Sequence, residues 1–171
     1  DVYKRQDEYD GVYLNCVFHA VEEMEGGVNG KYGTVGFKAT VLCDAPWGWE
    51  DGEAVYEAAE IGTQMAFQNP SVYKGYLYPD VILQTGTQGG SVMLQNVTDQ
   101  NRQTAFTGLN ATPHTITLRP ETLEVRSTLS TEPVYNCFNK NFFRLLPGLN
   151  RFAATGDIQK LTFQYRIARL I

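Results

Sequence analysis

The stretch from Asn136 to Ile171 reads NCFNKNFFRLLPGLNRFAATGDIQKLTFQYRIARLI. Its last part, residues 160–169, alternates between large apolar and polar side chains. A period of two with aromatic and β-branched residues is typical of a β-strand with one buried face. The face expected in the core carries Leu161, Phe163, Tyr165 and Ile167, and the opposite face carries Thr162, Gln164 and Arg166.

Two turns precede this strand. Pro147-Gly148 predicts the first, because proline presets φ and glycine tolerates a positive φ, and the run TGD at 155–157 predicts the second. Residues 150–155 then form a short strand between the turns, and the apolar run 142–146 forms another before them. The C-terminal stretch is therefore predicted to be a series of antiparallel strands that closes a sheet.

The remainder of the chain shows the same short strands and frequent turns. Hydrophobic residues make up 43% and aromatic residues 12% of the 171 residues, with 16 glycines and 7 prolines. This composition and the spacing of the turns favour an all-β fold, an antiparallel β-sandwich of the jelly-roll or galectin-like type, without an amphipathic helix. The strands expected before the C-terminal stretch are residues 12–24, 32–43, 54–60, 63–68, 77–84, 91–97, 102–106, 114–119 and 122–127.

The first two of these strands, 12–24 and 32–43, are expected to form a long β-hairpin around the turn residues 25–30. Two strands cannot bury an apolar face by themselves, so the hairpin needs a partner. The run DAPWGWEDG at 44–52 then interrupts the strands with a proline, two glycines and two tryptophans. We therefore expect the boundary between the hairpin and the sandwich there.

Several of these motifs resemble one protein family. The run NFFRLLPGLN at 141–150, followed by a glycine turn and an alternating last strand, is similar to the C-terminal end of the distal tail proteins of bacteriophages and prophages with long non-contractile tails. The run CDAPWGWE at 43–50, the step Tyr78-Pro79 and the stretch 106–109 resemble the same family. The resemblance covers roughly residues 9–171 and consists of strands and turns rather than a catalytic signature.

The resemblance implies a domain order. In that family an aromatic-rich linker joins an N-terminal ring-forming domain to a C-terminal galectin-like β-sandwich. Residues 7–44 would then be the closing β-hairpin of a truncated N-terminal domain, and residues 45–171 the sandwich domain. Residues 1–6, DVYKRQ, resemble a translated adapter from sequencing-library preparation, so we expect them to be a scar that lies outside the fold.

The resemblance also implies a structural function without catalysis. Members of the family form a homohexameric baseplate hub ring in the phage virion, after assembly in the cytoplasm of the bacterial host, and anchor receptor-binding or baseplate proteins. The implied partners are other copies of the full-length protein and other tail proteins, namely tail-tube, tail-tip and receptor-binding proteins. No cofactor is implied.

The charge pattern argues against two other classes of partner. The net charge is −5, and acidic and basic residues are interspersed without a run rich in lysine or arginine. Nucleic acid and anionic membranes are therefore not expected as partners. The apolar runs of the sequence are also shorter than the ~20 residues that a membrane-spanning helix needs.

Metal and disulfide chemistry receive little support from the sequence. The cysteines Cys16, Cys43 and Cys137 are odd in number and widely spaced, so we expect them to be small buried apolar residues. Cys16 and Cys43 lie on neighbouring predicted strands and can face each other there, but nothing in the sequence requires a disulfide. His19 and His114 are far apart in the sequence, so we expect half-exposed strand residues rather than metal ligands.

The motifs of common enzyme classes are missing. The sequence has no GxSxG, GxxxxGK[ST] or GxGxxG pattern. A sandwich-fold glycoside hydrolase needs two carboxylates on opposite sides of a sugar ring, and acidic residues crowded along one strand do not provide this arrangement. We therefore expect no enzyme activity and a solvated acidic face, to which belong Glu50, Asp51, Glu53, Glu57 and Glu60, with Glu121 and Glu124 further along the chain.

Aromatic residues are the remaining candidates for binding, because aromatic rings pack against sugar rings and against protein partners alike. For Trp47 and Trp49 the alternatives are packing between the two domains, a partner contact and sugar binding. Three tyrosines, Tyr73, Tyr76 and Tyr78, cluster before a strand. Their alternative to binding a sugar or a partner is packing in the core of the sandwich or at its rim. The candidate contacts to a partner or a glycan are Trp47, Trp49, Tyr73 and Tyr76, and a carbohydrate-binding β-sandwich module is the alternative function.

Overall fold

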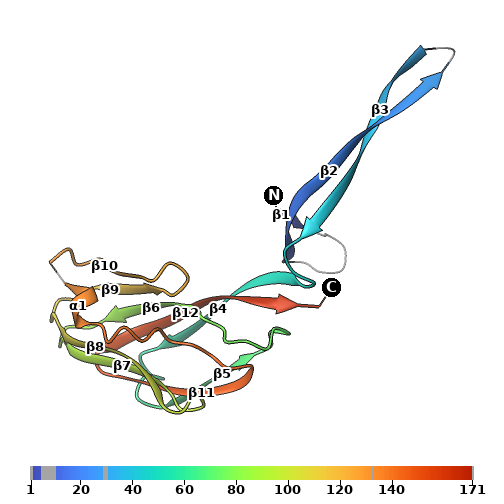
Figure 1. Cartoon of the computed structure of the whole chain (residues 1–171). Coiled ribbons are helices and arrows are strands. Elements are labelled where there is room, and N and C mark those ends of the chain that lie inside the picture. The colour runs from blue at the N-terminus through green and yellow to red at the C-terminus, as the bar shows by residue number, and fades with distance from the viewer. Residues whose placement is uncertain (1, 5–10, 29–30, 132, 171) are drawn as a thin grey trace. The chain divides into compact units, whose positions relative to one another are not determined.

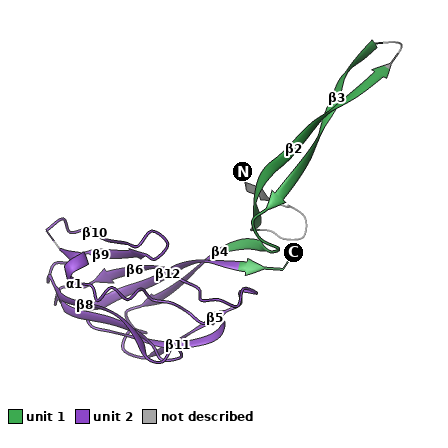
Figure 2. Cartoon of the chain, in the orientation of Figure 1, with its two compact units in different colours: residues 1–50, 168–171 green, residues 51–167 purple. Residues whose placement is uncertain are grey.

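The computed structural model describes residues 2–4, 11–28, 31–131 and 133–170 of the chain, so that part of the predicted turn at 25–30 lies outside the described residues. The described residues form mainly antiparallel β-strands joined by turns and loops (Figure 1). The chain divides into two compact units, residues 1–50 with 168–171 and residues 51–167 (Figure 2). The prediction of an all-β protein with an antiparallel sandwich is confirmed.

The first unit is built around a long hairpin. Its strands are β2 (Val12–Val28) and β3 (Lys31–Cys43), which pair from Cys16↔Cys43 to Val28↔Lys31 with two irregularities in register. The start of β2 also pairs with the first residues of β4 (Gly48–Glu57). A short strand β1 (Val2–Lys4) pairs with β2, and the origin of residues 1–6 stays a prediction.

The second unit is the β-sandwich. One sheet has the strand order β4-β12-β6-β9-β10 and the other has the order β5-β11-β7-β8. A single helical turn, α1 (Val134–Cys137), which the sequence analysis did not anticipate, follows β10. The remaining strands are β5 (Gln64–Asn69), β6 (Asp80–Thr85), β7 (Gly90–Asn96), β8 (Arg102–Leu109), β9 (Thr115–Arg119), β10 (Glu124–Ser127), β11 (Gly148–Thr155) and β12 (Ile158–Arg169).

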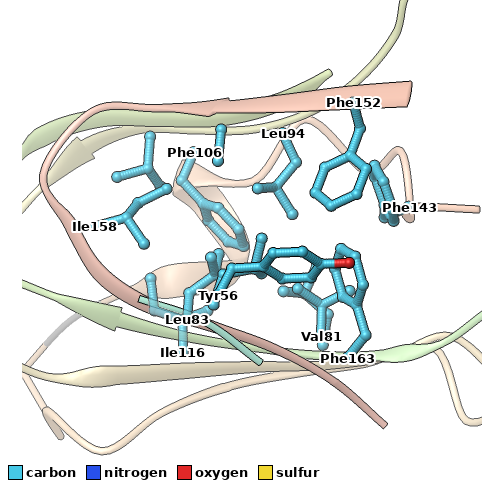
Figure 3. Packing of buried hydrophobic residues seen from close by; sticks show 14 of the residues in the cluster. Tyr56, Val81, Leu83, Leu94, Phe106, Ile116, Phe143, Phe152, Ile158 and Phe163 are labelled. Atoms are coloured by element: carbon cyan, nitrogen blue, oxygen red, sulfur yellow. The ribbon is translucent and has the colours of Figure 1, made fainter. Parts of the chain in front are cut away.

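The buried core of this unit lies between the two sheets, and the alternation of β12 supplies much of it (Figure 3). Leu161, Phe163 and Ile167 are buried as predicted, while Tyr165 is half-buried. Thr162 is buried as well, so the opposite face of β12 is not wholly exposed. Burying a side chain the size of Phe163 stabilises the fold by about 1.5–3 kcal/mol relative to an exposed one.

Both predicted C-terminal turns are present at the ends of β11. Gly148 has φ of +83° and Gly156 has φ of +102°, in the left-handed region that favours glycine. A Cβ on Gly156 would lie 2.2 Å from the carbonyl oxygen of Ser91, so the position also has no room for a side chain. The hairpin that joins β11 to β12 therefore depends on this glycine.

The predicted strand at 142–146 is wrong. Apart from one bridge between Leu145 and Leu77, this extended segment has no strand partner among the described residues. Side chains bind its backbone instead. The Asn96 amide donates a hydrogen bond to the Arg144 carbonyl at 2.8 Å. The Asn150 side chain accepts a hydrogen bond from the Leu146 N–H and donates one to the Leu146 carbonyl, both at 2.8 Å. Buried asparagines thus satisfy backbone groups that a neighbouring strand would otherwise satisfy.

Candidate functional site

The hairpin of β2 and β3 carries the largest set of exposed apolar side chains in the described chain. Their exposed fractions reach 85% for Tyr32, 70% for Phe37 and 68% for Val35. We call this set the hairpin surface, and it comprises Val17, Phe18, Val21, Met24, Tyr32, Val35, Phe37, Val41 and Leu42. An apolar surface of this kind marks a site of interaction with another protein.

The hairpin surface covers both faces of the hairpin. Successive side chains of a strand point to opposite faces, and both Val17 and Phe18 are apolar and exposed, as are both Val41 and Leu42. The strand edges are open too, because within the described residues β3 pairs only with β2, and β2 beyond Cys16 pairs only with β3. The sequence analysis anticipated that the hairpin needs a partner, but it did not identify this surface.

The base of the hairpin brings two cysteines together. Cys16 and Cys43 are directly opposite in the register of β2 and β3, and their Sγ atoms are 2.8 Å apart. The prediction that the cysteines are buried is wrong, because Cys43 is exposed and Cys16 and Cys137 are partly exposed. Cys16 and Cys43 lie at the base of the hairpin, where both faces carry exposed side chains.

The two tryptophans of the predicted linker pack against each other. The rings of Trp47 and Trp49 meet edge to face, with centroids 6.1 Å apart, and both residues are half-buried. An edge-to-face pair presents no flat double platform to a sugar, since the two rings are nearly perpendicular. A role of Trp47 and Trp49 in contacts with a partner stays a prediction.

The tyrosines between β5 and β6 form an exposed cluster. Tyr73, Tyr76 and Tyr78 are exposed to 49%, 45% and 47%, respectively, so they are not core residues. The Tyr76 and Tyr78 rings meet edge to face at 6.3 Å between centroids. The Arg144 guanidinium lies 3.9 Å from the centroid of the Tyr76 ring, which is a close cation–π contact.

Arg144 is itself fixed by Asp99. Its Nε donates to Asp99 Oδ2 at 2.7 Å and its Nη2 donates to Asp99 Oδ1 at 3.1 Å, in the two-pronged geometry that arginine favours with a carboxylate. This pair, followed by a hydrogen bond to Tyr78, raises the pKa of Arg144 above its usual value. The sequence analysis missed Arg144, because it lies far along the chain from the tyrosines.

The acidic residues of β4 are paired with basic and polar residues of β12. Asp51 lies 2.9 Å from Arg166, and Glu57 lies 3.3 Å from Lys160. Glu53 accepts a hydrogen bond from Gln164 at 3.1 Å. A series of such pairs along two neighbouring strands fixes their surface and lacks the opposed carboxylates of a glycosidase. Ion pairs in addition join Glu50 to Arg169 and Glu124 to Arg119 and Arg126.

The histidines are not arranged as metal ligands. His19 is exposed on β2, whereas His114 is 6% exposed, so the prediction of a half-exposed strand residue is wrong for His114. Thr85 holds it, with its Oγ1 3.1 Å from His114 Nδ1 and donating to the His114 carbonyl. Within the described ranges no group of three His, Cys, Asp or Glu side chains is placed to hold a metal ion. None of the helices in these ranges is long and apolar enough to cross a membrane.

The fold is similar to that of a solved phage protein. The crystal structure of the Dit (gp 19.1) protein of phage SPP1, described as a paradigm of the hub adsorption apparatus in phages that infect Gram-positive bacteria, is similar with a TM-score of 0.63 and 10% sequence identity. The similarity covers 94% of this chain and 62% of that protein, so the chain spans less than two thirds of it. No curated protein sequence matches. A model of the family described as phage tail C-terminal domain matches residues 47–165, well over half of the chain, and the chain therefore belongs to that phage tail family.

Proposed function

We propose that this protein is a hub component of a phage or prophage tail tip, which forms a homohexameric ring and anchors other tail proteins. The observation that carries the proposal is the hairpin surface, which is apolar on both faces and has open strand edges. A two-stranded hairpin is at best marginally stable in water, so this one needs a covering partner. Its fold similarity to the SPP1 hub protein and its tail family support a second copy as that partner.

The hairpin is suited to a ring because it offers different surfaces on its two sides. A neighbouring copy can add to the open edge of β3 while the next copy covers the edge of β2, which is a head-to-tail contact that closes when the rotation fits. Residues 7–44 would then form part of a ring-forming region, and residues 45–171 the part that presents docking surfaces. No catalytic step is proposed, and the assembled protein would reside in the virion.

Negative-stain electron microscopy and sedimentation velocity of the full-length protein test this proposal. We expect hexameric rings with a central channel. The variant Phe37→Glu places a charge on the hairpin surface and should weaken assembly at least about tenfold, the effect of losing one strong interface contact. Leu149→Glu is the matched control, because Leu149 is an apolar strand residue of the other unit with 51% exposure.

Two outcomes would contradict the hub function. One is that the full-length protein remains monomeric at the highest concentrations that sedimentation allows, and the other is that Phe37→Glu and Leu149→Glu weaken assembly equally. The second outcome would mean that assembly reflects general apolar exposure rather than the hairpin surface.

A second candidate function, the binding of carbohydrate, is favoured by the tyrosine cluster. Tyr76 keeps 45% of its surface exposed although Arg144 lies over its ring, so an aromatic surface beside a fixed guanidinium is open to solvent. A sugar ring packs its C–H face on such an aromatic surface, and its hydroxyls bond to the charged group beside it. Trp47 and Trp49 are weaker candidates because they pack on each other.

Saturation-transfer NMR with neutral mono- and oligosaccharides tests this candidate. Binding that Tyr76→Ala abolishes and Tyr32→Ala preserves would support it, since Tyr32 is an exposed tyrosine of the hairpin and lies outside the tyrosine cluster. The absence of transfer to any sugar of the panel, or equal loss in both variants, would reject it.

A further inference from the structure

We propose that Cys16 and Cys43 are the site of an intramolecular disulfide that fixes the register of the β2–β3 hairpin. The pair is the first in the register of these two strands, so the bond would lie at the base of the hairpin. This inference goes beyond the proposed tail function, and its chemistry can be tested without it.

The backbone positions the two cysteines for this bond. The N–H of Asp44 donates to the carbonyl of Asn15 at 3.0 Å, which makes Asn15 and Asp44 a hydrogen-bonded pair. Antiparallel pairs alternate, so the adjacent pair of Cys16 and Cys43 is a non-hydrogen-bonded one, with side chains close together and Cα atoms about 4.5 Å apart. A disulfide requires Cα atoms about 4.4–6.8 Å apart, so the strands need no rearrangement.

A covalent bond between the two strands would fix a register that the hairpin otherwise holds only weakly. Register is normally set by the face that the sheet buries, and a strand with both faces exposed is prone to slip. Both faces of this hairpin are exposed, and the contacts that mark its register, such as the ion pair of Glu22 with Lys38, are themselves exposed and therefore weak. A covalent bond between Cys16 and Cys43 excludes every slipped register, because slipping separates the two residues.

The reaction is a thiol–disulfide exchange with a small-molecule disulfide such as oxidised glutathione. The thiolate of the exposed Cys43 attacks the glutathione disulfide, which forms a mixed disulfide and releases one glutathione. Cys16 then loses its proton and attacks the Cys43 sulfur, which closes the bond and releases the second glutathione. In the reduced chain the hydrogen bond to Cys43 raises the pKa of Cys16 to about 11, so Cys16 keeps its proton during the first attack.

If the protein functions in a virion, the timing of the bond follows from the compartment. Cytosol keeps thiols reduced during assembly, and the medium outside the cell allows oxidation afterwards. The bond would then lock the hairpin after assembly; this step alone rests on the proposed function.

The test is oxidation of the purified folded chain by glutathione disulfide, followed by alkylation of the remaining thiols and intact mass measurement. We expect alkylation at Cys137 alone, and closure in the Cys137→Ser control at the same rate as in the unchanged chain. Cys16→Ser and Cys43→Ser should each stay open or stop at the mixed disulfide. Closure should be at least about tenfold faster in the folded chain than in urea, because the fold holds the two sulfurs together.

A second measurement separates the bond from its effect. Amide hydrogen exchange in β2 and β3 should be slower in the oxidised chain than in the reduced one. The proposal is overturned if three alkylated thiols persist after oxidation, if the bond involves Cys137, or if exchange in the hairpin is the same in both states. None of these outcomes depends on ring assembly, so they leave the hub function to its own test.

Discussion

The ring of Phe163 on β12 stacks on the ring of Phe143, with centroids 5.1 Å apart and planes inclined by 21°. Phe143 belongs to the extended segment before β11, so this stack joins that segment to the last strand. Phe163 also meets Phe152 at 5.3 Å and Tyr56 at 5.7 Å between centroids, and all these rings are buried. The centre of the sandwich is therefore a cluster of aromatic rings around Phe163.

Phe163→Ala should lower the free energy of unfolding by about 3–5 kcal/mol, because it removes a buried ring and leaves a cavity that the neighbouring rings cannot fill. Urea unfolding followed by circular dichroism measures this loss. The exposed neighbour Gln164 provides the control, and Gln164→Ala should change stability by less than about 0.5 kcal/mol. A loss below about 1 kcal/mol for Phe163→Ala would show that this residue is not in the core.

Asn150→Ala should destabilise the sandwich by about 1–3 kcal/mol, because it leaves the N–H of Leu146 without its partner, while the Leu146 carbonyl keeps a hydrogen bond from the Asn69 amide. The same urea experiment measures the effect, with the exposed Asn141→Ala as control. Equal stability of the two variants would mean that the extended segment is held by apolar packing alone.

The same segment shows where prediction from sequence ends. The alternation at 160–169 identifies β12 and its buried face, because the pattern is local to one strand. The apolar run 142–146 has an equally strand-like composition, but its hydrogen bonds come from Asn96 and Asn150, which no local pattern connects to it. Similarly, the burial of His114 depends on Thr85, a residue of another strand.

The candidate sites, too, could be predicted only in part from the sequence. That the hairpin needs a partner follows from its having only two strands, but a single sequence does not say what would cover it. The predicted Tyr73 and Tyr76 do gather with Tyr78 on the surface. Their link to Arg144 and Asp99 is visible only in three dimensions, since it joins distant parts of the chain.

Tyr56→Phe should change the stability of the protein at alkaline pH. The hydroxyl of Tyr56 donates to the Ala66 carbonyl at 3.2 Å, and burial, followed by the charge of Glu60, raises the pKa of Tyr56 from 10 to about 12. Because the folded state holds this proton more tightly, its contribution to stability is complete below pH 10 and is lost as the pH rises towards 12.

Below pH 10 the Tyr56→Phe variant should be less stable than the unchanged protein by about 0.5–1.5 kcal/mol, the net contribution of one hydrogen bond. This difference should shrink as the pH approaches 12, because phenylalanine has no proton to lose. Urea titrations at a series of alkaline pH values measure it. A difference that stays constant over this range would contradict the raised pKa of Tyr56.

Asp80→Asn should show the corresponding effect in acid. Burial raises the pKa of Asp80 above 3.8, although Arg119, at 3.6 Å, acts in the opposite direction. The unfolded chain therefore ionises at lower pH than the folded one, and the unchanged protein loses stability as the pH rises from 3.8 through the folded-state pKa. Asparagine cannot ionise, so Asp80→Asn should gain stability relative to the unchanged protein over the same rise in pH.

Arg119→Met should enlarge this pH dependence, because it removes the charge that lowers the pKa of Asp80. Unfolding in urea at acid and neutral pH measures the stability of both variants. If Asp80→Asn instead loses stability relative to the unchanged protein as the pH rises, the ion pair with Arg119 outweighs burial.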